Sequence, residues 1–387
     1  MSSGTETVQP QTNEPTIQRK QSNRMALYAV VGVVVVVAIV LVSGYAFLGW
    51  FKPASSNQQI VLGAGSTFVA PLMFQWASAY GGAAVNYNPI GSGAGIGQIT
   101  AHTIDYGASD APLTFTQAAA APGLLTIPEA GGAVSIIYNL PGVAQTLQFN
   151  GSILARIFMG NITTWNDPAL AAVNPGVSLP SASIIPVHRS DGSGTSYVFQ
   201  DYLAHDSATW AAKYPKSTVW GPNVGLGAKG SSAVATTVQT TADSIGYVDL
   251  EYALANSISY GKVQNPSGNY IHPNINNTAS ALADANVQIP AGSGNWSAVS
   301  FVNAPGAGDY PITSYTYVLV YQSLPIAGGV TNSLQRAQAL VNFLEWMITS
   351  GQSDNAGLYY VAIPANILAI DQASIHSITY SGQPVLM

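Results

Sequence analysis

The sequence predicts an α/β fold with parallel sheets, and three observations support this prediction. Short strand-like runs at residues 60–62, 85–87 and 136–138 alternate with helical stretches, a pattern typical of parallel sheets covered by helices. The chain has 387 residues, 48% of them hydrophobic, so it can bury a large core. Only 7% of the residues are charged, whereas a disordered chain combines low hydrophobicity with high net charge.

The first 52 residues predict where the protein works. A polar segment at residues 1–24 precedes an uncharged apolar stretch at residues 25–51, and about 20 apolar residues suffice to cross a bilayer. The cations before this stretch are Arg19, Lys20 and Arg24. Only Lys52 follows closely, which predicts a cytoplasmic N-terminus. We therefore expect a single-pass anchor in the cell membrane and an extracellular remainder. A cleaved signal peptide is the alternative, although its apolar part is usually shorter.

The composition excludes several classes of function. The formal net charge is −6 and no basic cluster follows the apolar stretch, so no nucleic-acid partner is expected. The chain has no cysteine, which removes thiolate chemistry and cysteine-ligated zinc. No common hydrolase, zinc-protease or nucleotide-binding motif occurs, and the five histidines lack metal-ligand spacing. We therefore expect no enzyme activity, no metal site and no cofactor.

A polar linker at residues 52–59 leads into three loops that are rich in glycine, serine and threonine. These loops, at residues 63–68, 91–95 and 191–195, each precede a predicted helix. Glycine lets the backbone approach a ligand, and hydroxyl side chains add donors. The first turn of a helix leaves N–H groups unpaired, so such loops bind anions without lysine. Taken alone, each loop is better explained as an ordinary N-cap; their recurrence favours an anion site.

Three charged residues sharpen this hypothesis. Arg189 lies at the mouth of the third loop, and its guanidinium offers a planar fork of donors that suits an oxyanion. Asp191 could hold that fork in place, or the two residues could form a plain surface ion pair. Asp110, in the segment 106–112, could equally cap a short helix on its position alone.

Together these segments resemble the phosphate-binding proteins that serve ATP-driven phosphate importers of the ABC type. The matching stretches occur in order between about residues 60 and 350. They are residues 63–68 with Pro71, Trp76 and Tyr80, then residues 91–93, 105–113, 189–196, 246–248 and 310–314. Any one of these loops would be a weak match, whereas their combination in this order is specific.

The resemblance implies a two-lobed periplasmic-binding-protein fold, type II-like, with a hinge between the lobes. The transmembrane helix predicted above would precede this fold. Lobe I is expected at residues 60–130 plus 306–387, and lobe II at residues 131–305. The implied ligand is inorganic phosphate, held between the lobes. The implied partners are the permease subunits of the importer, and the binding protein itself is expected to be a monomer.

The resemblance also implies the residues that contact phosphate. Carried over position by position, they are Thr67, Phe68 through its backbone N–H, Ser92, Asp110, Arg189, Ser193, Gly194 and Thr195. Ser66 and Asp191 are expected to support them.

Asp110 is expected to determine which anion is bound. An ionised carboxylate only accepts hydrogen bonds, and phosphate at neutral pH retains a proton to donate, whereas sulfate has none. A site built around that bond should reject sulfate. Three alternatives remain open at this point: another tetrahedral oxyanion such as sulfate, molybdate or arsenate, a secreted phosphate-ester hydrolase, and a structural surface protein.

Overall fold

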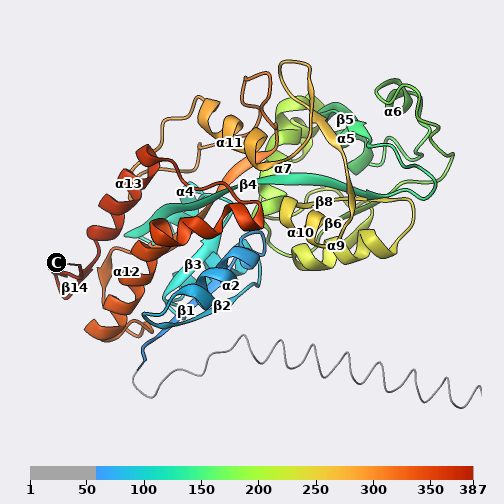
Figure 1. Ribbon diagram of the computed structural model, residues 1–387. Coiled ribbons are helices and arrows are strands. Elements are labelled where there is room, and N and C mark those ends of the chain that lie inside the picture. The colour runs from blue at the N-terminus through green and yellow to red at the C-terminus, as the bar shows by residue number, and fades with distance from the viewer. Residues whose placement is uncertain (1–57, 387) are drawn as a thin grey trace, which may run out of the picture. The chain divides into compact units, whose positions relative to one another are not determined.

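A computed structural model of the chain describes residues 58–386 (Figure 1). The apolar stretch predicted as a membrane anchor lies outside these residues. Within residues 58–386, no helix is both long enough and apolar enough to span a bilayer.

One hydrogen-bonded path of strands connects the described part of the chain. Its order is β2-β1-β3-β12-β4-β8-β6-β7, and β9 pairs with β4 outside this path. The strands are β1 (Ile60–Gly65), β2 (Ala84–Asn88), β3 (Tyr106–Ser109), β4 (Leu124–Asn139), β6 (Ile185–Arg189), β7 (Leu226–Ala228), β8 (Ser244–Asp249), β9 (Ser259–Tyr260) and β12 (Thr313–Tyr321). Two small sheets accompany it, formed by β5 (Gln148–Phe149), β10 (Lys262–Gln264) and β11 (Tyr270–Ile271), and by β13 (Ser323–Leu324), β14 (Thr379–Tyr380) and β15 (Gln383–Pro384).

Two groups of parallel strands form the two lobes. In lobe I, β1 is parallel to β2 and β3; in lobe II, β6 is parallel to β7 and β8. β12 and β4 run antiparallel to their neighbours, so the sheet is mixed. Parallel neighbours within a lobe are joined by crossover connections. β4 instead pairs with strands of both lobes. The predicted two-lobed α/β fold is confirmed, and the predicted parallel strands occur within a mixed sheet.

β4 joins the two lobes. Its residues 124–128 and 130–133 pair with β12, and its residues 134–139 pair with β8. All but one of its 16 residues are buried, as in strands covered on both faces. Figure 1 shows β4 extending from one group of helices to the other. Its register against β12 shifts between Thr316, opposite Ala130, and Tyr317, opposite Pro128. The residue between these two partners on β4 is a β-bulge.

Helices pack against both groups of strands. α2, α3 and α12 contact the strands of lobe I, and α7 and α9 contact those of lobe II. The helices are α2 (Ala70–Ala79), α3 (Ser92–Thr100), α4 (Phe115–Ala120), α5 (Gly151–Phe158), α6 (Pro168–Ala172), α7 (Gly194–Asp206), α8 (Ala208–Lys213), α9 (Gly230–Thr240), α10 (Leu250–Ala255), α11 (Ile275–Asp284), α12 (Leu334–Ile348) and α13 (Ala365–His376), with two 3-10 turns, η1 (Ser350–Asp354) and η2 (Ala356–Leu358).

Asp371 on α13 is a carboxyl group buried in lobe I. Neither of its side-chain oxygens has a hydrogen-bond partner among the described residues. Burial raises the pKa of Asp371 from 3.8 to about 9, because an unpaired charge is costly away from water. The side chain is therefore a neutral acid at neutral pH.

The free energy of unfolding should depend on pH through Asp371. Its folded pKa lies above its unfolded value, so its stabilising contribution is complete at about pH 4 and is lost as the pH rises toward 9. Between these pH values Asp371 should lower the free energy of unfolding by about 1.4 kcal/mol per pH unit. The Asp371→Asn variant should lack this decrease. Urea denaturation of both proteins at pH 5 and pH 7 measures the two slopes. Equal slopes would contradict the prediction.

Candidate functional site

The three glycine-rich loops follow β1, β2 and β6 and meet near the end of β3, where Asp110 lies. Ligands of α/β proteins commonly bind at the carboxyl ends of parallel strands. The Gly91 N–H, just before α3, donates to the carbonyl of Gly65 at the end of β1 at 2.8 Å. This bond holds the first loop against the start of α3. Across the lobes, the Gly93 N–H donates to the carbonyl of Gly192 at 2.9 Å. Two loops of lobe I and one of lobe II therefore form a single cluster.

Asp110 follows β3 and is 2% exposed. The Ser66 hydroxyl donates to its Oδ1 at 2.5 Å, and the Ser92 hydroxyl lies 3.5 Å from its Oδ2. Burial raises the pKa of Asp110 to about 6, against the opposing effects of these hydroxyls, the Thr316 hydroxyl and the charge of Arg189. Asp110 is not the cap of the helix that follows, because Thr114 caps α4 in a capping box.

Ser92 connects the two lobes. Its Oγ accepts the backbone N–H of Asp110 at 3.3 Å and that of Gly194, in lobe II, at 3.0 Å. Gly194 is the first residue of α7, and a Cβ at this position would lie 2.5 Å from Asp110 Oδ2. The first turn of α7 can therefore approach Asp110 only because residue 194 has no side chain.

Arg189 ends β6 with its guanidinium buried. Its Nε and Nη2 donate to the two carboxylate oxygens of Asp191 at 2.7 and 2.6 Å, and Nη1 donates to Ser231 Oγ at 3.3 Å. The side chain of Arg189 is 2% exposed, so the pair is not a surface ion pair. Burial alone would raise the pKa of Asp191, but the hydrogen bonds and charge of Arg189 hold it below its usual range. The Gly230 N–H also donates to Asp191, at 3.0 Å.

The other predicted residues lie in the same cluster. Thr67 Oγ1 is 2.9 Å from Ser231 Oγ and accepts the Ser231 N–H at 3.1 Å. The backbone N–H of Phe68 donates to Ser66 Oγ at 3.0 Å. Ser193 caps α7 by accepting the Ser196 N–H. The buried Oγ1 of Thr195 has no hydrogen-bond partner among the described residues. Every residue predicted for the site is therefore found at this junction of the lobes.

Comparison with known proteins identifies the family. A model described as a PBP superfamily domain matches residues 52–350. The phosphate-binding protein PstS of Xylella fastidiosa (strain Temecula1) is 38% identical over 317 residues, which cover 80% of this chain and 82% of that protein. PstS of Haemophilus influenzae is 35% identical over 328 residues, covering 83% and 93%. The chain belongs to the PstS family.

Solved structures share the fold of this PstS-family chain. The phosphate-bound protein PfluDING has a TM-score of 0.64 at 20% identity, covering 81% of this chain and 93% of that one. A putative phosphate transporter substrate-binding protein from Clostridium perfringens, with bound phosphate, has a TM-score of 0.56 at 19% identity, covering 79% and 100%.

Four residues that contact this cluster were not predicted from the sequence: Glu129, Ser231, Tyr247 and Thr316. Ser231 opens α9 after Gly230, and the glycine–hydroxyl pattern that identified the other loops would also have identified this one. Tyr247 on β8 accepts the Arg189 backbone N–H at 3.2 Å and pairs with Ser196 Oγ at 2.6 Å. Glu129 and Thr316 join the cluster from the two central strands, β4 and β12. A single acid in an apolar run was the only indication of Glu129.

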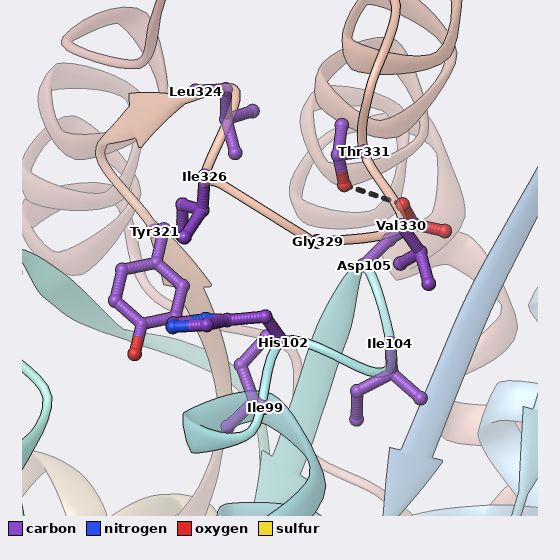
Figure 2. Close-up of a pocket in the computed structure, with 10 residues that line it drawn as sticks. All are labelled: Ile99, His102, Ile104, Asp105, Tyr321, Leu324, Ile326, Gly329, Val330 and Thr331. Atoms are coloured by element: carbon purple, nitrogen blue, oxygen red, sulfur yellow. Dashed lines mark hydrogen bonds between the residues drawn. The ribbon is translucent and has the colours of Figure 1, made fainter.

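A small hollow lies at the other end of the lobe I strands (Figure 2). His102, Tyr321 and Asp105 are among the residues that line it. The Asp105 carboxylate already accepts bonds from the Leu62 N–H at 2.7 Å and from Thr331 and Arg336 at 2.5 to 2.9 Å. The hollow has room for about one water molecule. It belongs to the packing of the lobe rather than to a site.

The close approach of α7 to Asp110 is testable by amide hydrogen exchange. In Gly194→Ala the new Cβ meets both the side chain and the backbone N of Asp110, so the contact between the lobes should loosen. Exchange of the Gly93 amide should accelerate about tenfold or more. Gly97→Ala is the matched control, because a Cβ on that residue of α3 meets nothing within 4 Å. Equal protection in Gly194→Ala and the unaltered protein would contradict this role.

Proposed function

We propose that this PstS-family chain binds inorganic phosphate between its lobes and delivers it to the permease subunits of an ATP-driven importer. One observation carries the proposal: buried hydrogen-bond donors from both lobes meet beside the buried carboxyl of Asp110. The guanidinium of Arg189 and the N–H groups at helix starts suit an oxyanion that has left water. The carboxylate of Asp110 suits the proton that phosphate retains.

The proposed contacts are those that the family resemblance implies: Thr67, the Phe68 N–H, Ser92, Asp110, Arg189, Ser193, Gly194 and Thr195. Several of these groups pair with protein partners, as the Gly194 N–H does with Ser92 Oγ. A phosphate ion would replace such bonds, because each oxygen that leaves water needs new donors. Ser66 and Asp191 would keep Asp110 and Arg189 in place through the bonds described above.

We also propose the lobe division that the resemblance implies, with residues 60–130 plus 306–387 in lobe I and residues 131–305 in lobe II. β4 would contain part of the hinge. The change of its partner from β12 to β8 after Ala133 supports this division to within a few residues. A hinge needs only a few residues that change their backbone angles, so each lobe can keep its own packing.

The location of the protein is the remaining part of the proposal. Residues 25–51 would anchor the chain in the cell membrane with residues 1–24 in the cytoplasm. The linker at residues 52–59 would then present the binding domain, as a monomer, at the outer surface. The length of the apolar stretch and the cations before it support this arrangement.

Isothermal titration with phosphate and then with sulfate tests the function and the role of Asp110. The unaltered protein, freed of bound ligand, should bind phosphate and give no heat with sulfate. Asp110→Ala and Asp110→Asn should each weaken phosphate binding roughly 10- to 100-fold, because a hydrogen bond to a buried charged acceptor is lost. Discrimination against sulfate should shrink in both variants.

Asp284→Asn is the matched control, because it makes the same change on the exposed end of α11. It should bind as the unaltered protein does. Sulfate binding by the unaltered protein would keep the anion site but change its ligand. Unchanged selectivity in both Asp110 variants would overturn the role of Asp110, and no binding of either anion would overturn the function.

A further inference from the structure

Glu129 is a second carboxyl group beside the anion site. It lies at the β-bulge of β4, where Thr316 is opposite Ala130 and Tyr317 is opposite Pro128, so that Glu129 itself has no partner on β12. Bulges redirect a side chain out of the regular alternation of a strand. Glu129 is fully buried, and an acid is rarely found in this position unless another group compensates it.

The hydroxyl of Thr316 connects Glu129 with Asp110. Thr316 Oγ1 is hydrogen-bonded to Glu129 Oε1 at 3.0 Å, and the same hydroxyl also lowers the pKa of the Asp110 carboxyl. Thr316 is fully buried. The second oxygen of Glu129, Oε2, has no hydrogen-bond partner among the described residues. The buried Thr316 hydroxyl therefore bonds one buried carboxyl and influences a second.

The number of protons in this chain of bonds decides its charge. A hydroxyl has one hydrogen to donate, so it can serve only one carboxylate. It can bond to both carboxyls at once only if one of them is protonated and donates to the hydroxyl oxygen. Asp110 also has the Ser66 hydroxyl and the nearby charge of Arg189 to stabilise its anion. Glu129 has Thr316 alone, so the proton resides on Glu129.

We propose that Glu129, acting through Thr316, is a positioning residue that keeps Asp110 an ionised acceptor and makes phosphate affinity depend on a proton held by Glu129. This inference rests on the proposed function and adds a residue that acts on the ligand through another. The neutral acid donates to Thr316, Thr316 donates to Asp110, and Asp110 is left to accept the proton of the ligand.

The electrostatics of the cluster agree with this order of bonds. Burial raises the pKa of Glu129 to about 8, against the effect of the Thr316 hydrogen bond, and the charge of Asp110 raises it further. Glu129 also interacts with Tyr87 on β2 and Tyr106 on β3. Burial raises both of their pKa values well above 10, so both stay neutral. Asp249, at the end of β8, is a further buried carboxyl that interacts with Asp110, and burial raises its pKa well above its usual range. At neutral pH the site therefore has an ionised Asp110 beside a neutral Glu129.

Loss of the proton would weaken binding for two reasons. An ionised Glu129 adds a negative charge beside the bound anion, and it competes with Asp110 for the Thr316 hydroxyl. A bound anion holds the proton on Glu129 more tightly, so phosphate binding and protonation are linked. The Kd for phosphate should then rise by up to about tenfold per pH unit above pH 8. Phosphate itself remains a singly protonated dianion from pH 8 to pH 10, so its own charge does not cause this rise.

The decisive experiment is the Kd for phosphate from pH 6.5 to pH 9.5 in the full chain and two variants. Glu129→Gln keeps the shape and a donor for Thr316 but cannot ionise. It should bind within about threefold of the unaltered protein at pH 7 and show no alkaline rise. Asp371→Asn is the matched control, since it removes the ionisable group of another buried acid, whose pKa is raised to about 9. It should show the full alkaline rise.

A nuclear magnetic resonance titration of the unaltered protein gives an independent readout. The chain has only five glutamates, so carbon-13 labelling of glutamate gives a simple carboxyl spectrum, and Glu129→Gln assigns the signal. One signal should titrate at about pH 8 and move to higher pH when phosphate is added. This measurement decides the matter if Glu129→Gln binds poorly at pH 7 because of altered folding.

Each outcome has one meaning. Phosphate binding with a Kd that is constant to pH 9.5, or an equal alkaline rise in Glu129→Gln, would overturn this inference and leave the proposed function intact. If the Kd for phosphate no longer rises at alkaline pH in Asp371→Asn, the rise reflects general destabilisation of the fold, and this inference is also overturned. If the unaltered chain binds no phosphate at pH 7, the proposed function fails first.

Discussion

Arg189 carries a guanidinium held almost completely out of water, and the loops around it are arranged to satisfy that buried charge. A buried cation needs an opposite charge and directed acceptors, because leaving either unpaired costs several kcal/mol. Asp191 supplies both through two parallel bonds. The Gly230 N–H at the start of α9 holds Asp191 in turn. The positions of β6, the third loop and α9 therefore depend on one ion pair. These elements in turn position the Arg189 guanidinium and the N–H groups at the helix starts.

The central strands impose a second constraint. β4 belongs to both lobes, and its bulge against β12 places a glutamate and a threonine beside Asp110. The cluster consequently combines three kinds of carboxyl: Asp191 with a lowered pKa, Asp110 with a pKa of about 6 and Glu129 with a pKa of about 8. Ion pairing lowers the first, and burial raises the other two. Chemically similar side chains thus take different charges within one site.

The location of most site residues could be predicted from local sequence. Glycine followed by serine or threonine at a helix start has the same backbone requirements wherever it occurs. Thr67, Ser92 and Gly194 were therefore recognisable, as was Arg189 in a chain with few cations. Ser231 was missed although it follows the same rule. Glu129 and Thr316 could not be paired from sequence, because they are 187 residues apart and meet only through a register shift.

The α/β class, the loops expected to bind an anion and the family resemblance could all be predicted from the sequence, because they depend on local periodicity and short motifs. Three features could be seen only in the folded chain: the antiparallel pairing of β4 and β12, the capping of α4 by Thr114 rather than Asp110, and the burial of Arg189 and Asp191. The proximity of Glu129 and Asp110 to the Thr316 hydroxyl is a further feature of this kind. Burial and proton sharing depend on distances between segments far apart in the chain, and residue order does not specify those distances.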